Sequence, residues 1–170
     1  IDPGNGNLEL RLVPNGTSLK LDAGTDFQIK SIQDEGGAEE TVFSLIRGKL
    51  RTLAARHGRG EKYTVQTPSA ICAVRGTEFI NEVGENGSAI IVRYGSVYVE
   101  SIAGDRWITL GANQGLNTRS ANYRPIIIPI AEIESMFAGS AFLGAEPPLV
   151  PGAPPAGAGE PTGSASGDIG

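Results

Sequence analysis

Apolar and polar residues alternate along most of the chain. Leu8, Leu10 and Leu12 are separated by polar residues, and the same two-residue period recurs in later segments. These further apolar sets are Leu19 and Leu21, Phe27 and Ile29, Tyr63 and Val65, Phe79 and Val83, Val97 and Val99, and Ile108 and Leu110. A period of two places apolar side chains on one face of a β-strand. The pattern predicts a series of short strands and no helix of ordinary length before residue 125.

Glycines interrupt this alternation at short intervals, at positions 16, 24, 36, 48, 60, 76, 87, 95, 104 and 111. Short strands separated by turns are typical of a β-sandwich, a barrel or a short-strand solenoid. Segments such as RGKLRTL and RGTEFINEV place a Gly before a strand, yet they follow no strict period, which favours an irregular stack over a true repeat. We therefore predict an all-β fold of stacked short strands, built as a β-sandwich or a solenoid-like domain.

The composition changes after Arg124, beyond which the chain has no Lys or Arg. Residues 125–130 (PIIIPI) are apolar and bounded by proline, which cannot donate a backbone hydrogen bond to a sheet, so an edge strand is predicted there. Pro129 can then open a short helix that docks on the sheet. The residues expected on its docking face are Ile130, Ile133, Phe137 and Ala141.

Residues 144–170 are rich in Pro, Gly, Ala and Ser. Such a segment buries too little apolar surface to offset the entropy of ordering, which predicts a flexible spacer. The alternative is a segment that becomes ordered when it binds a partner.

Bulk composition limits the classes of function. The formal net charge of −5 counts against nucleic-acid binding, which depends on clustered cations. Cys72 is the only cysteine, so the fold does not rest on an internal disulfide. No apolar run reaches the ~20 residues of a membrane-spanning helix. The first residues lack the pattern of a signal peptide, as expected of a mature or trimmed end.

Groups that carry catalysis or bind metals are scarce. His57 is the only histidine and lies in a hydrophilic segment that is predicted to be a hairpin loop, while Cys72 lies in an apolar run that predicts a buried core residue. One His and one Cys cannot build a structural zinc site, and the glycines introduce strands rather than phosphate-binding helices. We therefore expect no enzyme activity, no cofactor, no metal and no small-molecule ligand.

One charge feature departs from the acidic balance, because six basic residues fall within a short stretch. They are Arg47, Lys49, Arg51, Arg56, Arg59 and Lys62. Such a patch can bind an anionic glycan, a lipid headgroup or an acidic protein. The alternative is a solvated strand edge whose charges discourage aggregation.

The most specific stretch runs from Tyr63 to Phe79. Residues 67–69 (TPS) predict a turn, since Pro restricts both itself and the residue before it. The small and branched residues 71–74 suit a strand that is buried on both faces. Gly76 permits a bulge or a positive φ before the next strand, and Arg75 and Glu78 can form an ion pair across that bend.

This stretch resembles the signature of the FecR domain, in which a strand ending in Thr-Pro is followed by a small apolar segment and Val-Arg-Gly-Thr-Glu-Phe. The resemblance covers about residues 7–118. The motif residues are Thr67, Pro68, Arg75, Gly76, Thr77, Glu78 and Phe79, which we interpret as a turn-forming framework. The family's opening strands are missing from the sequence, and Asn81 stands where the alternation asks for an apolar residue, so a buried amide is predicted.

The resemblance implies an extracytoplasmic location and a role exercised by protein contact. We divide the chain into a FecR-like domain at residues 1–124, an apolar segment and helix at 125–143, and the tail at 144–170. The first hypothesis is a non-catalytic interaction or scaffold module of a secreted or envelope protein, including a subunit of a larger assembly. The alternative is the periplasmic sensing region of a transmembrane anti-sigma regulator of the iron-uptake type. The expected partners are other protein subunits or further copies of the chain.

Overall fold

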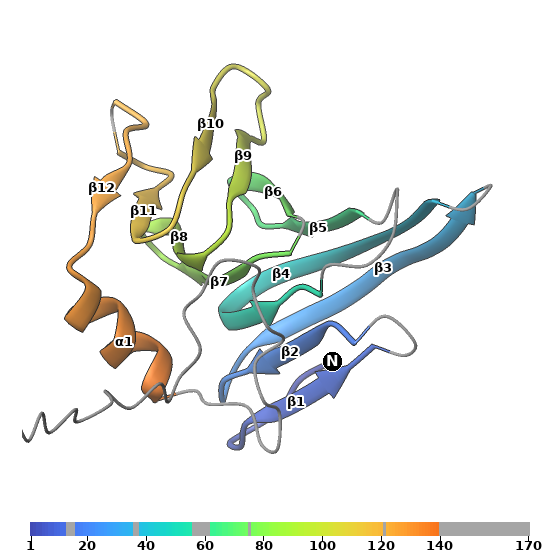
Figure 1. Ribbon diagram of the computed structural model, residues 1–170. Helices are drawn as coiled ribbons and strands as arrows, with labels where there is room; N and C mark the ends of the chain where they lie inside the picture. The colour runs from blue at the N-terminus through green and yellow to red at the C-terminus, as the bar shows by residue number, and fades with distance from the viewer. Residues whose placement is uncertain (13–15, 36–37, 56–61, 75, 121, 140–170) are drawn as a thin grey trace, which may run out of the picture.

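A computed structural model describes all residues except 13–15, 36–37, 56–61, 75, 121 and 140–170, together with all side chains in the described part except those of 32–40 and 62. Its strands are β1 (Leu8–Arg11), β2 (Ser18–Leu21), β3 (Asp26–Glu35), β4 (Ala38–Leu53), β5 (Lys62–Gln66), β6 (Ala70–Val74), β7 (Glu78–Gly84), β8 (Gly87–Tyr94), β9 (Val97–Ser101), β10 (Trp107–Leu110), β11 (Gln114–Asn117) and β12 (Ile126–Ile127). Helix α1 (Ile130–Ala138) follows them (Figure 1). The predicted all-β class with a short C-terminal helix is confirmed.

The strands run in the order β10-β9-β6-β5-β4-β7-β8-β11-β12, with β3 paired to β4 and with β1 and β2 attached through β4. This array forms two sheets that share β4. Sheet A contains β1, β2, β7, β8, β11 and β12, and sheet B contains β3, β5, β6, β9 and β10. The pairs are antiparallel except β4 with β5. The predicted stack of strands is therefore present, as one array that curls around a common core.

Strand β4 passes from one sheet to the other at a glycine. Its part up to Arg47 pairs with β3 and β5, and its part from Gly48 pairs with β2 and β7. Gly48 has a φ of +90°, in the region that favours glycine. A Cβ there would approach the Cα and Oγ1 of Thr25 to 2.6 Å. Any other residue would displace the neighbouring backbone, so Gly48 is what lets one strand serve both sheets.

The main core lies between the two sheets. Alternate residues along the strands point inward and are fully buried, as the two-residue period predicts. They include Leu19, Leu21, Phe27, Phe43, Leu45, Leu50, Val65, Cys72, Phe79, Ile90, Val92, Val97, Val99 and Leu110. The prediction of a buried, unpaired Cys72 is confirmed. The prediction that residues 71–74 are buried on both faces is wrong. Ile71 and Ala73 are partly exposed because successive side chains of a strand point to opposite faces of the sheet, and these two point away from the main core.

Helix α1 covers the outer face of sheet A and creates a smaller second core (Figure 1). Ile133 and Phe137 are buried there against Ile80 of β7 and Ile128. The helix begins beside the edge strand β12, and the carbonyl of Phe137 near its other end reaches a side chain of β4. Ile130 is 65% exposed, contrary to prediction, because it stands in the first turn, next to the edge strand.

The remaining predictions for the C-terminal part divide in two. Residues 126–127 form an edge strand, as predicted, paired only with β11 in the sheet. Ala141 and the segment 144–170 lie outside the described residues. Within the described part, no helix has the length and apolarity needed to cross a membrane.

Candidate functional site

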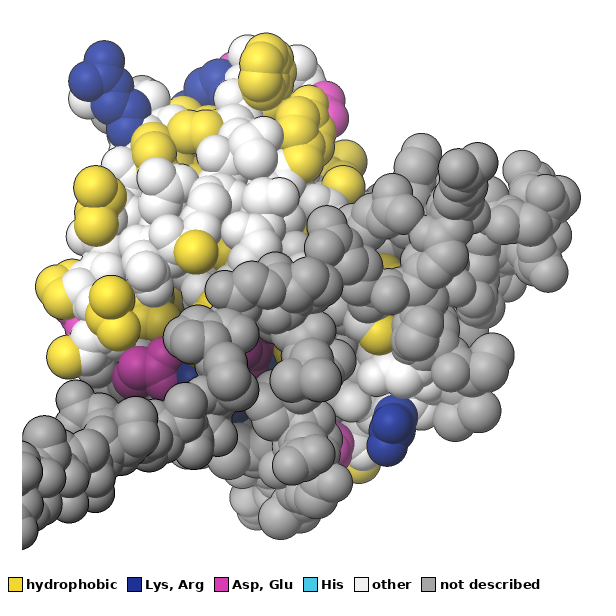
Figure 2. Space-filling model, in the orientation of Figure 1, with side chains coloured by type: hydrophobic (Ala, Val, Ile, Leu, Met, Phe, Trp, Pro, Cys, Tyr) yellow, Lys and Arg dark blue, Asp and Glu magenta, His cyan; other side chains and the backbone are white. Residues whose placement is uncertain are grey.

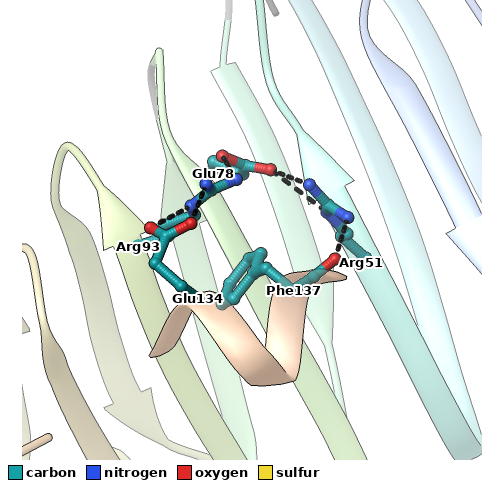
Figure 3. Close-up of polar contacts among 5 residues, drawn as sticks. All are labelled: Arg51, Glu78, Arg93, Glu134 and Phe137. Carbon is teal, nitrogen blue, oxygen red and sulfur yellow. Dashed lines mark hydrogen bonds and ion pairs between the residues drawn. The ribbon is translucent and has the colours of Figure 1, made fainter. Parts of the chain in front are cut away.

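A buried carboxylate of the FecR-like motif lies at the centre of an ion-pair cluster on the outer face of sheet A. Glu78 is 3% exposed and opens β7. Its Oε1 accepts hydrogen bonds from Arg51 of β4, from Nε at 3.1 Å and from Nη2, and its Oε2 lies 3.4 Å from Nη1 of Arg93 in β8. Three neighbouring strands therefore contribute to one charged junction (Figure 3).

Both arginines continue from Glu78 to helix α1. Arg51 Nη1 donates a hydrogen bond of 2.8 Å to the carbonyl oxygen of Phe137, near the helix C-terminus, where positive charge is stabilised by the helix dipole. Arg93 Nε donates to Oε1 of Glu134 at 3.0 Å, and Arg93 Nη2 donates to Oε2 of the same carboxylate. The cluster of Arg51, Glu78, Arg93 and Glu134 is called the helix junction below.

The ring of Phe137 lies within reach of both guanidinium groups. Its centroid is 5.0 Å from Cζ of Arg51 and 5.5 Å from Cζ of Arg93, so a cation–π attraction adds to the polar contacts (Figure 3). Partial burial by itself would lower the pKa of Arg93, but the hydrogen bond to Glu134 and the charge of Glu78 outweigh it and raise that pKa. The guanidinium of Arg93 therefore stays charged.

Local backbone contacts hold Glu78 in place. The Oγ1 of Thr77 donates to the carbonyl of Ser96 at 2.8 Å and accepts from its N–H, which ties the start of β7 to the turn between β8 and β9. Gly95 in that turn has a φ of +82°, and a Cβ there would lie 2.8 Å from the carbonyl oxygen of Gly76. The close packing of Gly76 and Thr77 against this turn therefore requires a glycine at position 95.

The Thr67-Pro68 half of the motif forms a different structure, a chain of hydroxyl groups that joins the two sheets. Thr67 Oγ1 donates to the carbonyl of Ala70, so its proton is committed. Ser88 Oγ of β8 then donates to Thr67, Ser69 Oγ donates to Ser88, and Thr118 Oγ1 donates to Ser69, over O···O distances of 2.7 to 2.9 Å. Every hydroxyl proton is used once, so the chain is fully paired internally and offers no free nucleophile or acid.

An open pocket of about 400 Å³ lies beside this hydroxyl chain. Its lining includes Arg47, Arg119, Glu85, Pro68, Ser69 and Ser88. Charges of both signs surround it, and its two serines already take part in the hydroxyl chain. The pocket shows no arrangement that points to a particular ligand.

The predicted buried amide at Asn81 is present. Asn81 is 0% exposed in the main core, its Oδ1 accepts a weak contact from Cys72 Sγ at 3.6 Å, and its Nδ2 has no hydrogen-bond partner among the described residues. Burial raises the pKa of the Cys72 thiol to about 12, which keeps the sulfur protonated and unreactive at neutral pH.

The predicted basic patch is divided by the structure. Arg47 is exposed and Lys49 half-buried on β4, but Arg51 is 6% exposed and belongs to the helix junction. Arg51 cannot form part of an exposed surface, because its side chain points toward helix α1 and is covered by it. Arg56, Arg59 and the side chain of Lys62 lie outside the described residues, and binding of an anionic partner by the rest stays a prediction.

The predicted pair of Arg75 and Glu78 is not described, because Arg75 lies outside the described residues, as does His57. The observed partners of Glu78 are Arg51 and Arg93, at sequence separations of 27 and 15 residues. Periodicity could not single out these two arginines, since each reads as an ordinary polar position on an exposed strand face. The described residues contain no group of three or more metal-ligating side chains.

The comparison with protein families agrees with this geometry. The family model described as FecR protein matches residues 4–98, more than half of the chain, including the whole motif. The chain belongs to the FecR family. A search of curated proteins finds no match.

Solved structures with a similar fold include two crystal structures, at 1.65 and 2.50 Å resolution, of a putative anti-sigma factor from Parabacteroides distasonis ATCC 8503. Their TM-scores are 0.64 and 0.65, with 21% sequence identity over 82% of this chain. The chain spans 64% of the length of those proteins. At this identity the likeness establishes the fold.

Proposed function

We propose that this domain is the extracytoplasmic sensing region of a FecR-type anti-sigma regulator, and that it works by protein contact rather than catalysis. The observation that carries the proposal is the FecR match over residues 4–98, which covers β1 to β8, the start of β9 and the motif. The fold shared with the anti-sigma factor structures supports it. We infer proteins as its partners and no cofactor.

The helix junction supports a role in signalling. A motif carboxylate, Glu78, binds the helix that follows the β domain through two arginines. A partner that alters the sheet at Glu78 would alter the attachment of α1, and through it the chain beyond. In this proposal residues 1–124 receive the contact, residues 125–143 carry the attached helix, and residues 144–170 form a tail behind it.

The scaffold function remains the second candidate. It is favoured by exposed apolar side chains at both ends of the strand order, which are Tyr98, Trp107, Ile126 and Ile127. Apolar groups of this kind at open sheet edges are typical of surfaces that assemble with other chains.

The two functions can be separated in the source organism. The codons for residues 4–138 are deleted in frame from the chromosomal gene, and total transcripts are compared with those of the parent strain. The regulator function predicts a several-fold change in one group of genes that share a promoter type, reversed by the wild-type gene in trans. An unchanged transcript profile together with a lost surface assembly would refute the regulator function and support the scaffold.

A further inference from the structure

The hairpin formed by β9 and β10 exposes an aromatic pair on the outer face of sheet B. Trp107 is 69% exposed and Tyr98 is 39% exposed, and their rings are stacked with centroids 6.2 Å apart. Ile102, at the tip of the hairpin, is 58% exposed. Figure 2 shows hydrophobic side chains at the top of the molecule, over this hairpin, with an acidic and a basic side chain beside them. Exposed Trp and Tyr in a cluster mark the residue types that dominate protein interfaces.

The edge of β10 next to this aromatic pair is open. Strand β10 ends the strand order and pairs only with β9. Ser101 N–H donates to the carbonyl of Arg106, which marks those two residues as a hydrogen-bonded pair. Hydrogen-bonded and non-hydrogen-bonded pairs alternate in an antiparallel ladder, so Trp107 and Thr109 direct their backbone N–H and C=O groups away from β9. Within the described part of the chain, neither residue bonds a further strand.

The usual protection of such an edge is missing. Natural edge strands carry Lys, Pro or inward-pointing charges that prevent strand addition, whereas β10 has the sequence WITL. An extended chain placed alongside β10 would bond to Trp107 and Thr109. Its side chains on the outer face would meet the Tyr98–Trp107 stack.

The charges around the stack favour a basic occupant. Glu100 is the cross-strand neighbour of Trp107, and Asp105 lies exposed in the hairpin turn. Asp105 is paired with Arg106, whose Nε lies 3.6 Å from it and whose guanidinium lies 4.9 Å from the ring centroid of Tyr123, so the negative charge next to the stack comes from Glu100. Carboxylates beside electron-rich ring faces attract Lys and Arg. A second copy of the same hairpin would bring equal charges together, in a chain whose net charge is −5.

From these observations we propose that the open edge of β10 binds an extended, basic segment of another protein, which adds as a strand and places Lys or Arg side chains on Tyr98 and Trp107. This inference rests on the proposed function only in that the domain works by protein contact. Strand addition supplies main-chain hydrogen bonds for affinity, and the aromatic pair with Glu100 supplies the preference for cations.

Binding can be followed directly because Trp107 is the only tryptophan of the chain. The probes are synthetic peptides of about seven residues, the length of an ordinary strand, with alternating Val and Lys, alternating Val and Arg, or alternating Val and Glu. We expect the Lys and Arg peptides to change the fluorescence of Trp107 in the full chain and the Glu peptide to leave it unchanged. Higher salt should weaken the binding.

Variants separate the contributions of ring, charge and backbone, with affinities measured by titration calorimetry. Trp107→Ala should weaken peptide binding roughly tenfold or more, as for a hot-spot residue. Glu100→Gln should reduce the preference for the Lys and Arg peptides. Thr109→Pro removes an outward N–H and leaves the β9–β10 ladder intact, so it should also weaken binding. Ile127→Ala, an exposed apolar position on the opposite edge strand, is the matched control and should bind as the wild type does.

Three results would overturn the proposal. Equal binding of the Glu and Lys peptides would remove the charge argument, and unchanged binding by Thr109→Pro would show that no strand is added. Sedimentation showing that the wild type self-associates and Trp107→Ala does not would make a second copy the occupant. None of these results depends on the transcript comparison, so failure of the regulator function and failure of this surface are distinguishable.

Discussion

The two halves of the FecR motif pair their buried polar groups in different ways. Around Thr67 the buried polar groups are neutral hydroxyls whose protons run in one direction between the sheets. Around Glu78 they are full charges that join sheet A to helix α1. Neutral donors and acceptors need one partner each, whereas a buried ion must be compensated by charge. Loss of one partner should therefore cost less stability in the hydroxyl chain around Thr67 than in the ion-pair cluster around Glu78.

The largest effect is expected for Glu78→Gln, which keeps the shape of the side chain and removes its charge. Arg51, itself buried, then loses its ion pair with this carboxylate, and the free energy of unfolding should fall by about 3–5 kcal/mol, the range for breaking a buried ion pair. Denaturant unfolding measures this, and limited proteolysis beyond residue 130 shows whether α1 is released. A change below about 1 kcal/mol would mean that the pair of Glu78 and Arg51 behaves like a solvent-exposed ion pair.

An intermediate effect is expected for Ser88→Ala in the hydroxyl chain. The change leaves the hydroxyl proton of Ser69 without an acceptor and removes the donor to Thr67. The free energy of unfolding should fall by about 1–3 kcal/mol, the range for an unpaired buried polar group. Thr109→Ala on the exposed face of β10 is the control, with an expected change within about 0.5 kcal/mol. Equal losses in the two variants would count against a specific role for the chain.

The contrast between neutral and charged groups can be tested at Cys72 by changing pH alone. Burial raises the pKa of Cys72 from 9.0 to about 12, so above pH 9 the unfolded thiol loses its proton while the folded thiol keeps it. The contribution of this thiol to the free energy of unfolding is therefore fully present below pH 9 and falls as the pH rises, by about 1 kcal/mol at pH 10. Unfolding curves of the wild type should show this loss relative to Cys72→Ala, and parallel pH profiles would contradict it.

The smallest effect is expected for Glu134→Gln at the exposed side of the helix junction. Its side chain is 47% exposed, so the pair with Arg93 is screened by solvent and should contribute less than about 1 kcal/mol. The loss should shrink further as salt is added. A loss as large as that of Glu78→Gln would show that α1 is held from its exposed side instead.

Local patterns were sufficient for the strands and for the motif. The alternation at Val97 and Val99 predicted inward faces, and the lone Cys72 in an apolar run predicted a core thiol. The mismatch at Asn81 predicted a buried amide. Each of these inferences depends only on the residue and its near neighbours.

The helix junction could not be found in this way. Arg51 read as part of a solvated basic stretch, although it faces helix α1, which lies far along the chain. Residues 71–74 were predicted to be buried on both faces, but whether a face is covered depends on which layer packs against it. The exposure of Ile130 has the same origin, since it depends on where the sheet ends.

The sequence by itself therefore determined the strand periodicity, the family, the burial of Cys72 and Asn81, and the polar and aromatic groups that are available for contacts. The tertiary structure decided which of those groups meet: Glu78 with Arg51 and Arg93, Ser69 with Ser88, and Trp107 with Tyr98 at an open edge. The physical reason is range. Alternation and turn geometry act between neighbours in the chain, whereas burial, ion pairing and open edges are properties of the assembled sheets.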